Sequence, residues 1–166
     1  DPYLRFYYRF LANRQTQLAL GVQEQALEEI KRHLRDFIGM HTWEELCREW
    51  LLRASANGSF TELIDQVGSV WTSSAQVDVV GLNSMTKVLV LGECKWGTQS
   101  MGRTVLTDLL AKTAAVIPGS GQWRVHYLGF DRAGWTEAAQ QFAQEFAVNP
   151  ASGPNWQGAT FRLLDL

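Results

Sequence analysis

The spacing of apolar residues changes once along the chain, and this change constrains the fold more than any other feature. Before the turn-rich stretch SANGS at 55–59, apolar residues recur every three or four positions, which is typical of amphipathic helices. After it the spacing falls to about two, which is typical of strands. The order of helices, a three-strand meander and then alternating helices and strands favours a mixed α/β sheet flanked by helices.

The apolar pattern also gives the approximate bounds of each element. The first predicted element is a helix whose one face carries an aromatic stripe from Tyr3 to Leu11. About five strands are expected in one sheet. The predicted helices cover 3–13, 22–37 up to Gly39, 43–52 after a capping Thr42, 103–116 and 134–147, and the predicted strands cover 67–71, 76–82, 87–96, 123–130 and about 159–166.

Composition excludes several classes of protein. Hydrophobic residues make up 46% of the 166 residues and aromatic residues 11%, which argues against disorder, collagen and coiled coils. No apolar run approaches the ~18 residues of a membrane span, and the first residues do not form a signal peptide, so we expect a soluble, cytoplasmic protein without membrane contact. Cys47 and Cys94 lack metal-like spacing and are expected to be core thiols.

The charge is nearly balanced, with 15 basic and 17 acidic residues and a formal net charge of −2. A domain that binds nucleic acid by itself usually has a basic surface. A nucleic-acid partner would therefore be held by a local patch or by a neighbouring domain. The chain begins Asp1-Pro2 without a methionine, from which we expect a piece of a longer protein.

Three charged residues lie in strand patterns that should be buried. Asp78 stands among valines, and Glu93 and Lys95 flank Cys94 at the end of an equally apolar run. Buried charges are costly unless they are paired or used. Alternate strand residues share a face, so Glu93 and Lys95 should project together while Cys94 faces the other side of the sheet.

The loop between the two strands decides whether Asp78 joins them. With a loop of two or four residues, opposed residue numbers sum to an odd value, and Asp78 shares the face of Glu93 as its diagonal neighbour, at ~7–8 Å. An odd loop or a bulge would separate the two. If the two carboxylates share a face, they and the main-chain oxygen of Cys94 suit Mg²⁺ or Mn²⁺. Lys95 would then orient a nucleophile or stabilise charge on a phosphate.

These residues resemble a known superfamily. The D…E-x-K arrangement of Asp78, Glu93 and Lys95 on a hairpin, with flanking helices, is similar to the PD-(D/E)XK nuclease superfamily, the restriction-endonuclease-like fold. The segments DPYLRFYYRFL, WEEL, VDVVGLN and LGECKW look more narrowly like the C-terminal domain of unknown function of archaeal-type AAA ATPases. The resemblance implies catalytic roles for Glu44, Asp78, Glu93 and Lys95, with Asp78 and Glu93 holding the metal.

The same resemblance implies a domain arrangement. Residues 1–38 would be a helical segment that follows a missing ATPase and winged-helix region, and residues 39–166 would be the nuclease-like domain. No phosphate-binding G-x-x-x-x-G-K-[ST] motif occurs, so ATP hydrolysis would belong to the missing region. One departure is Gln76 in the stretch QVD, where the family commonly has an acidic residue.

Several alternatives remain open on the sequence alone. The chain is either a metal-dependent nuclease acting on DNA, or an inactive descendant that binds DNA or a partner and regulates the ATPase, or a dimerisation module built on the aromatic N-terminal helix. An E-x-K tripeptide is commonly just a solvated ion pair, and Glu45 or Glu49 compete with Glu44. Lys112 lies in a region where, by the same resemblance, related nucleases sometimes keep a polar helper, although a helix lysine is usually just solvated. Trp71 and Trp96 are the tryptophans suited to a surface role, and no role is assigned to His33, His41 or His126.

Overall fold

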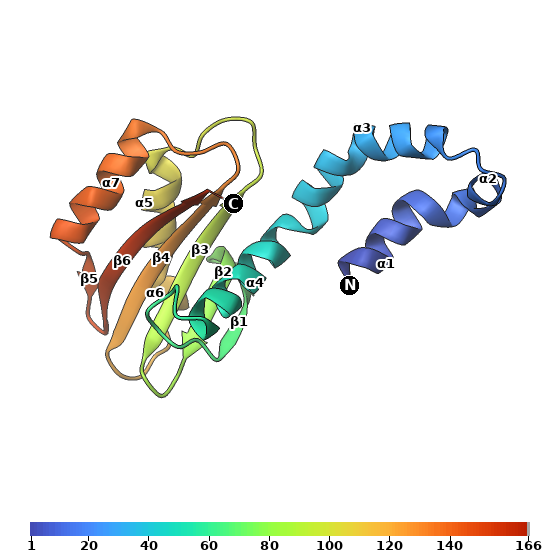
Figure 1. Cartoon of the computed structure of the whole chain (residues 1–166). Coiled ribbons are helices and arrows are strands. Elements are labelled where there is room, and N and C mark those ends of the chain that lie inside the picture. The colour runs from blue at the N-terminus through green and yellow to red at the C-terminus, as the bar shows by residue number, and fades with distance from the viewer. Residues whose placement is uncertain (166) are drawn as a thin grey trace. The chain divides into compact units, whose positions relative to one another are not determined.

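A computed structural model describes residues 1–165, except for the side chain of His41 (Figure 1). The chain divides into two compact units, Asp1–Trp43 and Glu44–Leu166. Each unit is described by itself below. None of the helices in the described part of the chain has the length and hydrophobicity needed to cross a lipid bilayer.

The first unit is entirely helical. It contains α1 (Pro2–Phe6), a π-helical turn η1 (Tyr7–Leu11), a 3-10 turn η2 (Ala12–Arg14), α2 (Gln15–Ala19) and α3 (Glu24–His41). The Asp1 carboxylate caps α1 by accepting hydrogen bonds from the N–H groups of Tyr3 and Leu4. Phe10 is the buried residue of the aromatic stripe, and its ring packs against Phe6 and Phe37.

One predicted helix end and one predicted helix cap are wrong in this region, whereas the predicted start of the next helix at Trp43 is confirmed. The helix predicted to end at Gly39 continues to His41, because Gly39 does not adopt the positive φ that ends a helix at glycine. Thr42 was expected to cap the next helix, α4 (Trp43–Ala56), through its hydroxyl group. That hydroxyl is buried and makes no hydrogen bond with any residue that the structure describes.

The second unit is built on a mixed sheet of six strands in the order β1-β2-β3-β4-β6-β5. Strands β1 (Gln66–Trp71), β2 (Gln76–Asn83) and β3 (Val88–Lys95) form the antiparallel meander, and β4 (Trp123–Asp131) and β6 (Trp156–Asp165) continue it in parallel. The α/β class and the flanking helices are confirmed, but about five strands were predicted. The sixth, β5 (Ser152–Gly153), lies in the loop before β6 and is too short to show a period. Leu166 lies outside the described residues.

Helices cover both faces of this sheet (Figure 1). On one face α5 (Arg103–Ala111) packs against β3 and β4, while α7 (Glu137–Val148) packs against β6. The main core lies here, with Tyr127 of β4 stacked on Phe161 of β6. On the other face α4 places Leu51 against Gly81 of β2 and Trp50 against Phe130 of β4. The single helix predicted over 103–116 is divided at Lys112 into α5 and α6 (Thr113–Val116).

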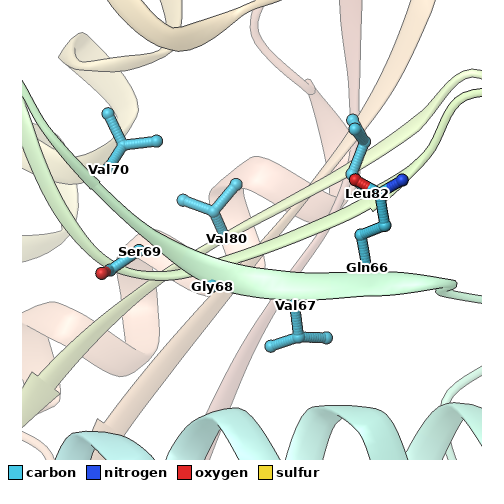
Figure 2. A pocket seen from close by; sticks show the side chains of 7 residues that line it. All are labelled: Gln66, Val67, Gly68, Ser69, Val70, Val80 and Leu82. Carbon is cyan, nitrogen blue, oxygen red and sulfur yellow. The ribbon is translucent and has the colours of Figure 1, made fainter.

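A shallow hollow of about 220 Å³ lies over β1 and β2 (Figure 2). Val70 and Val80 point into it from neighbouring strands, and Val67 points to the opposite side, toward a helix. Its lining contains no ionisable side chain. The hollow therefore offers no acid, base or metal ligand, and the charged residues lie elsewhere in the sheet.

Candidate active site

The charged residues gather at one end of the sheet because of its topology. Strands β3, β4 and β6 run parallel, so their carboxyl ends meet at one edge, and their register places Lys95 beside Asp131 and Asp131 beside Asp165. Strand β2 runs the opposite way and therefore begins at this edge, with Asp78 near its start. Open α/β sheets commonly bind ligands outside the carboxyl ends of their strands.

The β2–β3 hairpin brings Asp78 and Glu93 to the same end of the sheet. The loop has four residues, between the paired Asn83 and Val88, so opposed residue numbers have an odd sum as expected. The ladder runs to Val79 opposite Gly92. Asp78 and Glu93 each lie one residue beyond this last pair, and the charge of Glu93 acts on Asp78. The expected diagonal relation between them stays a prediction.

The Asp78 carboxylate is held at the start of β2 in a dry environment. Its side chain is buried, with 6% of the residue exposed, and Oδ2 accepts a hydrogen bond of 3.0 Å from the N–H of Cys94. Burial raises the pKa of Asp78, and the nearby carboxylates of Glu93 and Glu44 raise it further, against the opposing effects of the Cys94 N–H and Lys95. Asp78 is thus an acid whose negative charge the fold does not fully compensate.

Glu93 is the most heavily paired of the acids. Its Oε1 accepts a hydrogen bond of 2.9 Å from Lys95 Nζ, and its Oε2 accepts one of 3.0 Å from Lys112 Nζ. Burial disfavours the charge on Lys95, but the hydrogen bond and the charge of Glu93 outweigh this and raise the pKa of Lys95. Lys112 was expected to be solvated; it is instead partly buried and bound to Glu93 at the junction of α5 and α6.

Helix α4 supplies the third acid. Glu44 pairs with Arg48 one turn later at 3.4 Å, and the same Arg48 Nη1 donates a hydrogen bond of 2.7 Å to the main-chain oxygen of Asp78. The charge of Glu44 contributes to the raised pKa of Asp78. Glu49, one of the competing choices, is engaged by Arg53 at 2.8 Å. Arg48 thus fixes the first turn of α4 to the start of β2.

Asp131 is an acid of this edge that the sequence did not single out. It is fully buried at the end of β4, in register with Lys95, and its Oδ1 accepts a hydrogen bond of 2.7 Å from the N–H of Ala133. Burial raises its pKa, and the charge of Asp165 adds to this effect. Its Oδ2 has no hydrogen-bond partner among the residues of the described part.

The donor set determines which metal could be held here. In the described residues, no three His, Cys, Asp or Glu side chains converge as a ready metal cluster. Asp78, Glu93 and the main-chain oxygen of Cys94 nevertheless offer only hard oxygen donors. Mg²⁺ is usually held by one or two carboxylates and keeps several waters, so this set fits Mg²⁺ or Mn²⁺ and does not fit a metal that needs four protein ligands.

The remaining histidine and cysteine residues of the second unit have structural contacts. Both cysteines are free and buried, as predicted, and Cys94 contacts Cys47 through their thiols. His126 is buried, and its Nδ1 lies 2.9 Å from the hydroxyl of Thr160. Burial lowers the pKa of His126, so this side chain is neutral near pH 7. His33 lies in the first unit, and the side chain of His41 is outside the described part.

Comparison with known proteins identifies a family. Residues 7–105, more than half of the chain, match the model of DUF234, which is described as archaea bacterial proteins of unknown function. The matched range includes Glu44, Asp78, Glu93 and Lys95 and ends before Lys112 and Asp131. No curated protein and no solved structure gave a significant match. The chain belongs to this family of archaeal and bacterial proteins of unknown function.

Proposed function

We propose that the second unit is a metal-dependent nuclease domain that hydrolyses phosphodiester bonds in nucleic acid, with DNA as the first substrate to test. The observation that supports the proposal is the cluster at the end of the hairpin, where the charges of Glu93 and Lys95 act on the buried Asp78 and Lys95 donates a hydrogen bond to Glu93. The resemblance of this arrangement to the PD-(D/E)XK superfamily supports it. The same proposal includes an ATPase and a winged-helix region that precede this chain in a longer protein.

Each residue has a distinct task in this proposal. Asp78, Glu93 and the carbonyl oxygen of Cys94 would hold Mg²⁺ or Mn²⁺. The bound ion would polarise the phosphodiester and acidify a water molecule. Lys95 keeps its proton because its pKa is raised, so it can donate hydrogen bonds to the attacking water or to a phosphate oxygen. Glu44, half-exposed beside Arg48, would accept a hydrogen bond from a further water.

A cleavage assay tests the proposal directly. Plasmid and single-stranded DNA are incubated with the chain and Mn²⁺ or Mg²⁺, and with EDTA as the blank. We expect cleavage that falls by about 100-fold or more in Glu93→Gln and Lys95→Met, because each substitution removes a group that acts on the reacting phosphate or on the ion. Glu49→Gln, on the same helix as Glu44 but paired with Arg53, is the matched control and should leave the rate unchanged.

One observation favours the second candidate, an inactive domain that binds DNA or a partner and regulates the ATPase. Both oxygens of Glu93 are already bound to ammonium groups, which is also how a purely structural ion-pair cluster would look. Calorimetric titration of Mn²⁺ separates the two candidates. Saturable binding that disappears in Asp78→Asn supports the nuclease, whereas no binding and no cleavage by the unaltered chain would leave the regulatory role.

A further inference from the structure

A tryptophan and an arginine form a stacked pair one residue beyond the E-x-K lysine. Trp96 directly follows Lys95 on β3, and Arg132 directly follows Asp131 on the parallel neighbour β4. The main-chain N–H of Arg132 donates a hydrogen bond of 3.3 Å to the oxygen of Lys95, which continues the ladder past the strand ends. The guanidinium carbon of Arg132 lies 5.0 Å from the centre of the Trp96 ring.

Arg132 differs from the other arginines of this unit in its electrostatic partners. Four of the five others contact a glutamate, namely Arg48, Arg53, Arg103 and Arg124, and the fifth, Arg162, donates a hydrogen bond to the main-chain oxygen of Ser59. Among the described residues Arg132 has no such carboxylate, and its side chain is exposed. An arginine stacked on an aromatic ring is held in place while its N–H groups remain able to bind an anion.

The surroundings of the pair allow an anionic chain to approach. Residues 97–100 are exposed and uncharged, and no acidic residue occurs from Trp96 to Thr107. The acid next to Arg132 in sequence, Asp131, is fully buried beneath this edge. In the aligned row of Lys95, Asp131 and Asp165, the exposed carboxylate is that of Asp165, which lies two strands away from Lys95. The pair therefore adds a cationic contact beyond Lys95 at this edge, in a chain whose net charge is −2.

We propose that Trp96 and Arg132 bind a nucleotide of a single-stranded nucleic acid at the edge of the sheet that carries the proposed active site. This inference rests on the proposed nuclease function and names its substrate class. A base would stack on the Trp96–Arg132 pair, and the adjoining phosphate would accept hydrogen bonds from the guanidinium group. Base faces are open to such stacking in single strands and closed in an intact duplex, so unpaired nucleic acid is the preferred form.

Binding in EDTA tests the inference apart from any cleavage. A fluorescently labelled dT 12-mer is titrated with the chain at low salt, and its fluorescence anisotropy is compared with that of a duplex of equal length. Stacking on a protein ring is worth about fivefold or more in affinity for each base. We therefore expect Trp96→Ala and Arg132→Ala each to weaken single-strand binding by at least about fivefold, and Trp96→Phe to retain most of it.

Matched controls come from elsewhere in the same unit. Trp71→Ala removes a tryptophan that is 68% exposed at the end of β1, and Arg53→Ala removes an exposed arginine of α4. Both should bind as the unaltered chain does. Circular dichroism checks that each variant is folded. If Trp96→Ala does not fold, Arg132→Gln tests the pair in its place.

Two results would overturn the inference. The first is no measurable single-strand binding by the unaltered chain, and the second is binding in which the Trp96 and Arg132 variants match the controls. Cleavage with intact affinity in these variants would remove the inference and leave the nuclease proposal standing. If the Trp96 and Arg132 variants alone lose single-strand binding and the unaltered chain never cleaves DNA, the binding inference stands and the nuclease proposal falls.

Discussion

Asp78 is a buried acid whose ionised form costs stability. Its pKa is raised in the folded protein, chiefly by burial, so folding is penalised whenever the carboxylate must be ionised. The loss of unfolding free energy is full above the folded-state pKa of Asp78, and it vanishes below the unfolded-state pKa of about 4. Asn has the same shape, and its amide oxygen can still accept the hydrogen bond from the Cys94 N–H.

We therefore predict that Asp78→Asn is more stable than the unaltered chain at pH 7, and that this advantage shrinks as the pH falls toward 4. Urea denaturation at a series of pH values measures the free energy of unfolding. Glu49→Gln, an exposed ion-pair partner of Arg53, is the control and should show a much smaller change. An Asp78→Asn variant that is less stable at pH 7 would mean that the carboxylate is fully compensated.

The two cysteines should be unreactive in the folded protein. Both are buried, and the neighbouring Cys47 thiol and burial together raise the pKa of Cys94 well above its ordinary value. Because the thiolate is the reactive form, we predict negligible alkylation by iodoacetamide at pH 8 until urea unfolds the chain, measured by mass spectrometry. Rapid modification of Cys94 under native conditions would contradict this.

The sequence singles out Asp78, Glu93 and Lys95 because their signal is local. Asp78 interrupts a run of valines, and Glu93 and Lys95 interrupt another, so each stands out against the pattern of its own strand. Asp131 and Lys112 gave no such signal. Their importance comes from the parallel pairing of β4 with β3 and from the break between α5 and α6, which join residues far apart in the chain.

The hairpin beneath α4 depends on a glycine for its packing. A Cβ built at Gly81 of β2 would lie 2.8 Å from Leu51 Cδ2 and 3.2 Å from Val90 Cβ. We predict that Gly81→Ala destabilises the protein by about 1–3 kcal/mol, because side chains of a packed core must shift. Thermal and urea unfolding measure the change.

Gly68 of β1 provides the matched control. A Cβ there meets nothing within 4 Å, so Gly68→Ala should alter the free energy of unfolding by no more than about 0.5 kcal/mol. Equal losses in the two variants would show that the strand backbone, and not the contact with α4, sets the cost.

Element types were predictable where the apolar period was long, and boundaries were not. The eight-residue strands β2 and β3 show a clear pattern, whereas β5 has two residues and no pattern at all. Helix α3 passes through Gly39 because glycine ends a helix only when its φ becomes positive, which residue identity does not decide. The hairpin register needed the loop length, which the sequence left open between two and four residues.

The charge of the whole chain limits how it can bind nucleic acid. With a net charge of −2 and most of its basic side chains paired, few cations can release counterions from a bound strand. Each phosphate contact to a single strand contributes about −0.7 to the slope of log affinity against log salt concentration. One or two phosphate contacts would therefore give a shallow slope, and we predict a slope no steeper than about −2 for the dT 12-mer. The affinity is measured between about 50 and 200 mM salt. A much steeper slope would indicate an extended basic surface.

The division into two units predicts that the site does not need the N-terminal helices. The acids and lysines of the site lie in Glu44–Leu166, together with the sheet and the hydrogen bonds that position them. Under the nuclease proposal, a chain that begins at Thr42 should therefore unfold cooperatively and bind Mn²⁺ with the affinity of the intact chain. Circular dichroism melting and calorimetry measure both properties. If the shortened chain folds but loses Mn²⁺ binding that Asp78→Asn also abolishes in the intact chain, residues 1–41 contribute to the site and the second unit is not functionally separate.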